Sequence, residues 1–161
     1  DQTLDTQPVR LKPLCQQLID YFELPAAERE IDFKLRGEAQ IQANTELFRR
    51  ALANILANAV RHADPSSTIS IQLQQDDHQV QISICNQGDA LSAAQLTHIF
   101  DRFYRAESAR THQGSSGLGL AITKAIVHAH QGQITAESSA RNTCFKLSLP
   151  SDNHDQVKVK I

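Results

Sequence analysis

The sequence predicts an α/β (α+β) two-layer sandwich, in which three long helices pack against a mixed, mostly antiparallel sheet of about five strands. Apolar residues recur at helical spacing in three long segments, and polar and apolar residues alternate in several short ones. The short segments mostly follow one another through polar turns. They do not alternate strictly with helices, as they would in a doubly wound fold.

The first half of the chain is expected to hold two long helices with short strands between them. The first helix runs from about Lys12 to Glu30. Its apolar face is formed by Leu14, Leu18, Ile19 and Phe22. Two alternating stretches, 31–36 and 39–43, are predicted to be strands. The next helix begins near Asn44, a favourable N-cap residue, and continues to about His62.

The second half is expected to complete the sheet and to add a third long helix. Residues 68–86 alternate as two strands joined by a polar turn, and Ser92 caps a short helix over 92–100. Residues 101–116 are polar and show no apolar period. The third long helix is expected from about Gly117 to His130, before a closing hairpin over 133–140 and 143–150. We assign residues 1–150 to one domain and 151–161 to a frayed tail.

Composition argues against several classes of protein. The 16 Lys and Arg residues nearly balance the 18 Asp and Glu residues, so a bulk electrostatic grip on nucleic acid is not expected. No apolar run approaches the roughly 18 residues that cross a bilayer, and no signal peptide opens the sequence. Because the chain starts without methionine, we expect it to be a piece of a longer protein. Cys15, Cys85 and Cys144 form no CxxC pair and are predicted to be reduced thiols of a cytoplasmic protein.

The helix over 44–62 carries two asparagines one turn apart, which a helix interior does not favour. On a helical wheel, one wide apolar arc holds Phe48, Leu52, Ile55, Leu56, Ala59 and Val60. The opposite stripe holds Arg50, Asn54, Asn58, Arg61 and His62. Two interpretations are open on these residues alone. One is a solvated helix face. The other is a site for a magnesium-bound polyphosphate, since amide oxygens suit Mg²⁺ and basic side chains bind phosphate.

Two glycine-containing stretches favour the polyphosphate site. HQGSSGLGLAITKA places Gly114, Gly117 and Gly119 at the start of a helix, whose free N–H groups attract phosphate. It lacks the GK[ST] ending of a Walker A loop and the strand that precedes a dinucleotide fingerprint. A simple glycine hinge is the alternative. In ISICNQGDALS a strand ends at Asn86 and Gly88 follows, which either makes a turn or presents an amide to a base edge.

In this order and spacing, these segments resemble the ATP-binding catalytic domain of bacterial sensor histidine kinases, over about residues 8–150. NILANAVRHAD resembles its asparagine box, ICNQGDAL the first glycine box, FDRFYRAE the phenylalanine box, GSSGLGLAI the second glycine box, and SSARNTCFKLSLP the closing hairpin. The resemblance implies the Bergerat fold shared with type II topoisomerase ATPase domains, Hsp90 chaperones and MutL. FDRFYRAESAR with GSSGLGLAI is also similar to sensor kinases that respond to heavy metals such as copper.

The resemblance implies a role for each matching position. Asn58 would supply an oxygen to Mg²⁺ with Asn54 supporting the same edge, Arg61 and His62 would contact phosphates, and Asn86 would meet the adenine amine. The catalytic set is Asn54, Asn58 and Arg61. The remaining ATP-binding positions are Gly88 (leaving room for the ring), Leu91, Phe100, Tyr104, Arg105, Gly117, Leu118, Gly119, Leu120 and Thr143. Residues 102–116 would form a mobile ATP lid anchored by Phe100, Phe103 and Tyr104.

Three positions depart from the family pattern. Asn86 stands where an aspartate is usual, so its hydrogen bond to adenine loses charge assistance of about 1 kcal/mol, or several-fold in affinity. Ala90 replaces a glycine of the same box. Asn142 replaces a glycine of the closing hairpin, and asparagine also tolerates left-handed backbone geometry. A degenerate pseudokinase that only docks on partner helices is therefore a second hypothesis.

Asn54 bears on the choice between a kinase and an ATPase. Hydrolysing members of the superfamily carry a water-activating glutamate at this position, and asparagine takes no proton. Transfer to a histidine, which is nucleophilic when neutral, is therefore favoured over hydrolysis. An anti-sigma-factor serine kinase of the same superfamily is a third hypothesis.

The resemblance also implies partners for the chain. None of its seven histidines lies in a phosphoacceptor setting, and His128 and His130 are expected at the surface. The acceptor would lie on separate dimerisation helices of the same kinase, to which the first few residues of the chain would link. A response regulator receiver domain would be a further partner. The full-length protein would be a membrane-anchored homodimer, with this domain on the cytoplasmic side of the inner membrane.

Overall fold

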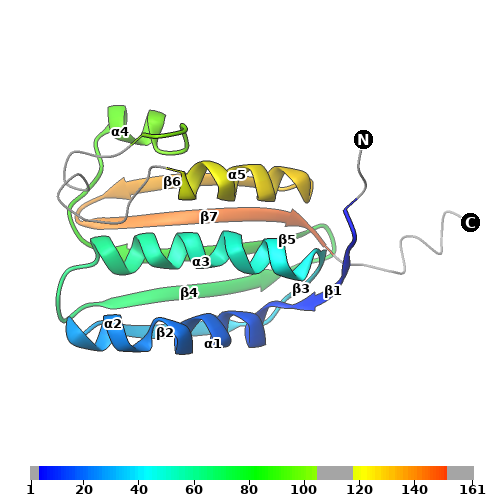
Figure 1. Ribbon diagram of the computed structural model, residues 1–161, viewed down its shortest axis with the longest axis horizontal. Coiled ribbons are helices and arrows are strands. Elements are labelled where there is room, and N and C mark those ends of the chain that lie inside the picture. Colours follow the sequence, from blue (N-terminus) through cyan, green and yellow to red (C-terminus); the bar gives the residue numbers. More distant parts are fainter. Residues whose placement is uncertain (1–3, 105–117, 152–161) are drawn as a thin grey trace, which may run out of the picture.

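One layer of the computed structural model, which describes residues 4–104 and 118–151, is a five-stranded mixed sheet. In spatial order its strands are β2 (Asp32–Gly37), β4 (Thr68–Gln75), β5 (Gln79–Gln87), β7 (Asn142–Pro150) and β6 (Gln133–Ser139). β2 runs parallel to β4, and the other neighbouring strands pair antiparallel. The second layer consists of α1 (Leu11–Tyr21), α3 (Thr45–His62) and α5 (Gly119–Ala129), with α3 in the middle (Figure 1). The predicted two-layer sandwich is confirmed.

The period of each element decides which residues enter the core between the layers. In β5 every second residue from Val80 to Asn86 is buried on the helix-covered face, and β7 buries its residues from Thr143 to Leu149 in the same way. The apolar arc predicted for α3 is buried throughout. Each fully buried Leu, Ile or Phe side chain contributes about 1.5–3 kcal/mol relative to an exposed one.

The helix expected over 12–30 is divided into two. α1 ends at Tyr21, and α2 (Glu23–Glu28) begins after Phe22. Pro25 explains the division, because in a continuous helix its ring would clash with the carbonyl of Tyr21 and it has no N–H to donate there. In the first turn of α2 the missing N–H costs nothing, since N–H groups there lack intrahelical partners.

A separate two-stranded sheet lies beside the main one. β3 (Gln40–Ala43), which we expected as a strand, pairs antiparallel with β1 (Gln7–Arg10), which we did not expect. β1 buries Val9 alone and contains Pro8, so its four residues show no alternation. The extended conformation of β1 therefore follows from its pairing with β3 and could not be predicted from its local sequence pattern.

The caps and turns predicted from sequence are largely confirmed. The Asn44 side chain accepts a hydrogen bond from the N–H of Leu47 at the start of α3. Ser92 forms a capping box at α4 (Ala93–His98). In the β4–β5 turn, a carboxylate oxygen of Asp76 accepts from the N–H groups of Gln79 and His78, and these bonds lower the pKa of Asp76.

Two features of the closing part of the fold correct the sequence analysis. The left-handed residues of the β6–β7 turn are Ala140 (φ 47°) and Arg141 (φ 61°), whereas Asn142 already belongs to β7. His130 is buried, and His128 is exposed as expected. His130 Nδ1 donates to the carbonyl of Ile126 (2.7 Å), so Nε2 is free to accept from the N–H of Asn44 (3.0 Å). Its ring therefore joins the end of α5 to the start of α3.

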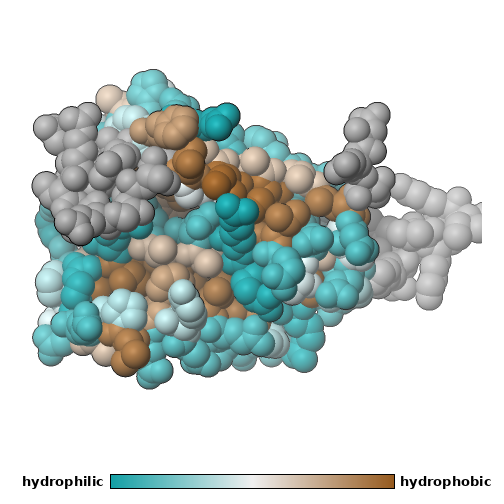
Figure 2. All heavy atoms as spheres, in the orientation of Figure 1, coloured by the Kyte–Doolittle hydropathy of each residue, from teal (hydrophilic) through white to brown (hydrophobic). Residues whose placement is uncertain are grey.

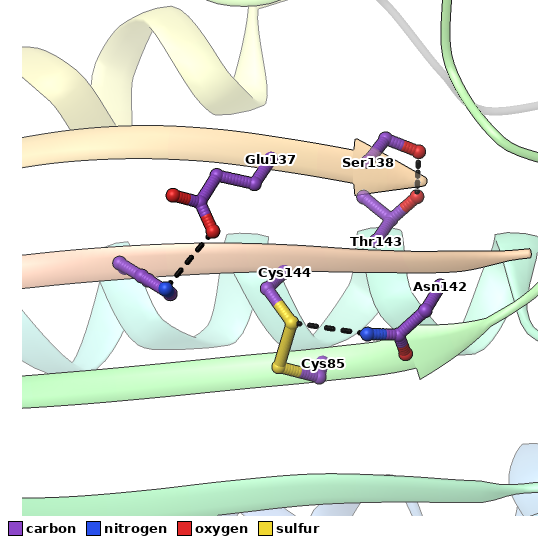
Figure 3. Close-up of a disulfide and its surroundings, with 7 residues drawn as sticks. Cys85, Glu137, Ser138, Asn142, Thr143 and Cys144 are labelled. Carbon is purple, nitrogen blue, oxygen red and sulfur yellow. Dashed lines mark hydrogen bonds and ion pairs between the residues drawn. A yellow bond between two sulfur atoms is a disulfide. The ribbon is translucent and has the colours of Figure 1, made fainter. Parts of the chain in front are cut away.

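The prediction of three reduced thiols is wrong for two of them. Cys85 and Cys144 form a disulfide between β5 and β7 (Figure 3). They are direct register partners with Cα atoms 4.0 Å apart, on the sheet face away from the helices. Cys15 is free, and burial raises the pKa of its thiol to about 12, so the thiol stays protonated and unreactive. Among the described residues, no helix is long and apolar enough to cross a membrane.

Candidate functional site

The asparagine stripe of α3 faces the N-terminus of α5. Asn54 donates its side-chain amide to the carbonyl oxygen of Gly119 at 3.1 Å, and the hydroxyl of Thr123 donates to the same oxygen at 2.9 Å. Asn58 lies one turn further along the same side of α3 and is half-buried. Asn54 is thus held between two helices, and the interpretation of this stripe as a solvated face is wrong for Asn54.

The N-terminus of α5 presents backbone donors beside this stripe. Its N-cap residue is Leu118, which makes no side-chain capping hydrogen bond, and the first N–H groups of a helix have no partner within the helix. A Cβ added at Gly119 would lie 3.7 Å from Asn54 Cγ, an ordinary contact. The protein fold itself therefore does not require glycine at position 119. A close approach by a ligand would explain it, because phosphate binds most closely where the backbone is bare.

Asn86 lies at the end of β5 on the helix-covered face and is 3% exposed. Its register partner on β7 is Thr143, which is also buried. Within the described residues, no group forms a hydrogen bond with the side-chain amide of Asn86. A buried amide without a partner costs about 1–3 kcal/mol, which a ligand that supplies the partner removes.

A chain of hydrogen bonds fixes Thr143 and the loop that follows β5. The hydroxyls of Ser138 and Thr143 form a hydrogen bond across the β6–β7 hairpin (Figure 3), with their oxygens 2.7 Å apart. The N–H of Leu91 donates to the same Ser138 oxygen at 2.8 Å. Ser138 was not predicted as a site residue. Its position opposite Thr143 follows from the register of the hairpin.

Gly88 packs against the end of α3. A Cβ at this position would lie 2.3 Å from the carbonyl oxygen of His62, so a larger residue would force the backbone apart. Backbone packing thus requires glycine here whether or not a ligand is bound. The expected second reason, room for the adenine ring, stays a prediction.

Arg29, which we did not predict, holds the last turn of α3. Its guanidinium donates to the carbonyls of Val60 and Ala63, and more weakly to that of Arg61 at 3.4 Å. These carbonyls belong to a helix end that lacks intrahelical donors. The turn that carries Arg61 and His62, both half-buried, is therefore fixed in place.

The aromatic residues expected to anchor a lid behave differently from one another. Phe100 packs edge-to-face on the core residue Phe145, with ring centroids 6.0 Å apart, and Tyr104 stacks beside His98. The prediction is wrong for Phe103, which is 65% exposed and contacts the guanidinium of Arg102. Arg105, Gly117 and the rest of the expected lid (105–116) lie outside the described residues.

Two groups of predicted residues come together at one end of the helix layer. Asn54 of α3 lies beside Gly119 at the start of α5, with Asn58 one turn further along α3, and Asn86 and Thr143 are register partners at the end of the sheet. The loop after Asn86 contacts both neighbouring elements, since Leu91 bonds to Ser138 of the β6–β7 hairpin and Gly88 packs against His62 of α3. The described parts of the site thus offer the first N–H groups of α5 beside Asn54. They also offer the amide of Asn86 and the hydroxyl of Thr143 near the end of α3, which carries Arg61 and His62.

A family model of known proteins matches residues 43–153, and its description is Histidine kinase-, DNA gyrase B-, and HSP90-like ATPase. The chain belongs to this family. Its domain binds ATP, and the chain is a catalytic domain of the sensor histidine kinase type. The matched residues include both groups of the site, from Asn54 to Thr143.

Curated relatives agree with this assignment, and a solved structure has the same fold. The sensor histidine kinase CusS of Escherichia coli O157:H7 is 40% identical over 136 residues, which cover 83% of this chain and 28% of CusS. The sensor protein CzcS of Cupriavidus metallidurans is 38% identical, over 91% of this chain and 31% of CzcS. The chain thus spans less than a third of these relatives. The catalytic domain of the histidine kinase ThkA has the same fold, with a TM-score of 0.82 at 22% identity over 92% of this chain and 97% of that one.

Proposed function

We propose that the chain binds Mg-ATP between α3, the start of α5 and the end of β5, and that the γ-phosphoryl group passes to a histidine on another domain. The observation that carries the proposal is the buried amide of Asn86, which has no hydrogen-bond partner among the described residues. An adenine edge supplies both a donor amine and acceptor nitrogens, so it satisfies this group.

The adenine is expected to lie against Asn86 and Thr143. The Asn86 side-chain oxygen accepts from the exocyclic amine of the base, and the half-buried Leu91 contributes an apolar contact. Because Asn86 is neutral where a carboxylate is usual, we expect an affinity several-fold below that of an aspartate-containing site.

The polyphosphate is expected to lie along α3 at the start of α5. The N–H groups of the first turn of α5, at Gly119 and Leu120, donate to phosphate oxygens, and Arg61 and His62 add basic side chains. Among the described residues, no group forms a hydrogen bond with the side chain of the half-buried Asn58, which offers a hard amide oxygen that fits Mg²⁺. Bound there, Mg²⁺ supplies charge neutralisation for the phosphates. The phosphate contacts that we expect from Arg105, Gly117 and Leu118 stay predictions.

Asn54 favours phosphoryl transfer over hydrolysis. Its amide nitrogen is engaged with the carbonyl of Gly119, and its side chain has no group that takes a proton from water. A neutral histidine needs no such activation. Asn54 thus positions α5 against α3, and we assign the phosphate and metal contacts to its neighbour Asn58.

We propose that the whole protein extends beyond this chain, since the relatives are about three times its length. The histidine would lie on dimerisation helices, and the apolar side chains gathered over α5 suit docking on such helices (Figure 2). The structure of ThkA was solved with the response regulator TrrA, so we propose a receiver domain as the next phosphate acceptor. Membrane anchoring, dimerisation and a response to heavy metals stay predictions for the full-length protein.

The test is phosphoryl transfer in the full-length protein that carries this chain. With γ-labelled ATP, we expect label that is labile in acid and stable in alkali, as phosphohistidine is. Asn58→Ala should abolish the label, and Arg50→Ala, on the same stripe two turns earlier, should not. Acid-stable label would indicate a serine kinase. ATP binding without label in the wild-type protein would favour a docking domain.

A further inference from the structure

The tip of the β6–β7 hairpin holds the loop 88–91 at two backbone positions. The N–H of Gly88 donates to the carbonyl of Arg141 at 3.0 Å, and the N–H of Leu91 donates to the Ser138 hydroxyl at 2.8 Å. These bonds span both ends of the loop that follows the buried Asn86. The position of this loop therefore depends on the hairpin, about 50 residues away in the sequence.

The side chain of Arg141 adds two ion pairs at the same place. One guanidinium nitrogen donates to Asp89 of the loop at 2.9 Å, and another donates to Asp64 at 2.6 Å. Asp64 follows the end of α3, and its N–H donates to the carbonyl of Gln87 at 2.7 Å. Arg141 thus joins three segments: the end of α3, the loop after Asn86, and the hairpin that carries Thr143.

The hairpin itself gains nothing from arginine at this position. Ser139 and Asn142 are register partners, so Ala140 and Arg141 form a two-residue turn in which both residues have positive φ. Such turns favour glycine and asparagine, because other side chains crowd the backbone in this region. An unfavourable residue in a strained turn calls for a reason outside the turn.

Stabilisation of the fold by the ion pairs of Arg141 does not explain why arginine occupies this turn position. The side chain of Arg141 is 59% exposed and that of Asp89 is 89% exposed. Pairs at such sites contribute little to unfolding free energy, because water and salt screen them. Two carboxylates on separate segments that share one guanidinium do restrict how far those segments move apart. The contact is better suited to holding a loop in one position than to stabilising the domain.

We propose that Arg141 is a positioning residue for nucleotide binding, which holds the loop 88–91 against the end of α3 so that the base meets a preformed site. The inference rests on the proposed ATP site at Asn86 and Thr143. Arg141 itself does not touch the nucleotide. Without this side chain the loop keeps its hydrogen bonds to the carbonyl of residue 141 and to Ser138 but loses its link to Asp64. The loop then moves more, and part of the binding energy is spent on ordering it.

The test compares Arg141→Gly with Ala140→Gly in the same two-residue turn. Both variants relieve the left-handed strain, so both should melt at or above the wild-type temperature. Ala140→Gly should bind ATP as the wild type does. Arg141→Gly should bind about five-fold more weakly, which is about 1 kcal/mol, and Arg141→Asn should match it. Arg141→Lys should recover part of the loss, since it keeps the charge without the planar fork.

Two further measurements separate positioning from a general structural effect. The preference for ATP over inosine triphosphate should fall in Arg141→Gly, because the loop lies beside the base and not the phosphates. In the nucleotide-free protein, the amide of Leu91 should exchange about five-fold faster than in Ala140→Gly. Wild-type affinity in Arg141→Gly would overturn the role of Arg141 and leave the ATP site standing. No ATP binding by the wild type would overturn both.

Discussion

Replacing Asn86 by alanine separates a role in binding from a role in folding. The side-chain amide is buried and has no hydrogen-bond partner among the described residues, and removing such a group recovers about 1–3 kcal/mol of desolvation cost. The cavity left by the smaller side chain costs a comparable amount, about 1–2 kcal/mol. The two effects nearly cancel, so we expect the free energy of unfolding to change by less than about 1 kcal/mol. For a domain of this size that is a shift of about 2–4 °C in Tm.

Nucleotide binding should respond differently. The net contribution of one neutral hydrogen bond is about 0.5–1.5 kcal/mol, so the Kd for ATP should rise about three- to ten-fold in Asn86→Ala. Thermal unfolding and calorimetric titration of the same samples measure both quantities. Ser83→Ala is the matched control, because Ser83 is on the same strand with its side chain on the opposite face. A variant that loses more than about 3 kcal/mol of stability and keeps its ATP affinity would refute the reasoning, since Asn86 would then be a core residue.

Other substitutions test further contacts. Gly88→Ala should lower the free energy of unfolding by about 1–3 kcal/mol in urea denaturation, because its Cβ meets a backbone oxygen. Gly119→Ala should fold normally and bind ATP more weakly, and normal binding would exclude a close phosphate contact there. Reducing the Cys85–Cys144 disulfide, whose cysteines are 59 residues apart, should cost about 4 kcal/mol of stability. A thiol count in denaturant should find one free thiol, and a count of three would contradict the cross-link. The hydrogen bonds that lower the pKa of Asp76 stabilise the fold above its ordinary pKa of 3.8, so the stability difference between wild type and Asp76→Ala should shrink as the pH falls below that value.

Sequence patterns predicted most of the fold because helices and half-buried strands obey local rules. Helix α3 was placed correctly from its 3.6-residue period and the cap at Asn44. The break between α1 and α2 was missed, although Pro25 signals it. β1 was missed because Val9 is its one buried residue and pairing with β3 decides its conformation. Local patterns carry no information on such a pairing.

The residues of the site also differ in whether local sequence patterns reveal them. The residues on α3, β5 and α5 were predicted because they belong to contiguous motifs. Arg29 and Arg141 were missed, since their partners are between 31 and 77 residues away and neither arginine carries a local signal. The disulfide was missed for the same reason, because it depends on the register of β5 against β7. Contacts that fix the site from outside its motifs thus required the three-dimensional structure.

The most direct test of the account is a calorimetric titration of the chain with ATP, with and without Mg²⁺, alongside Asn58→Ala. We expect saturable binding with a Kd of tens to hundreds of micromolar, about −5 to −6 kcal/mol, tightened by Mg²⁺ in the wild type. Asn58→Ala should remain folded and lose the Mg²⁺ effect. No binding of millimolar ATP to the folded wild-type chain, or an equal Mg²⁺ effect in Asn58→Ala, would contradict the proposed site.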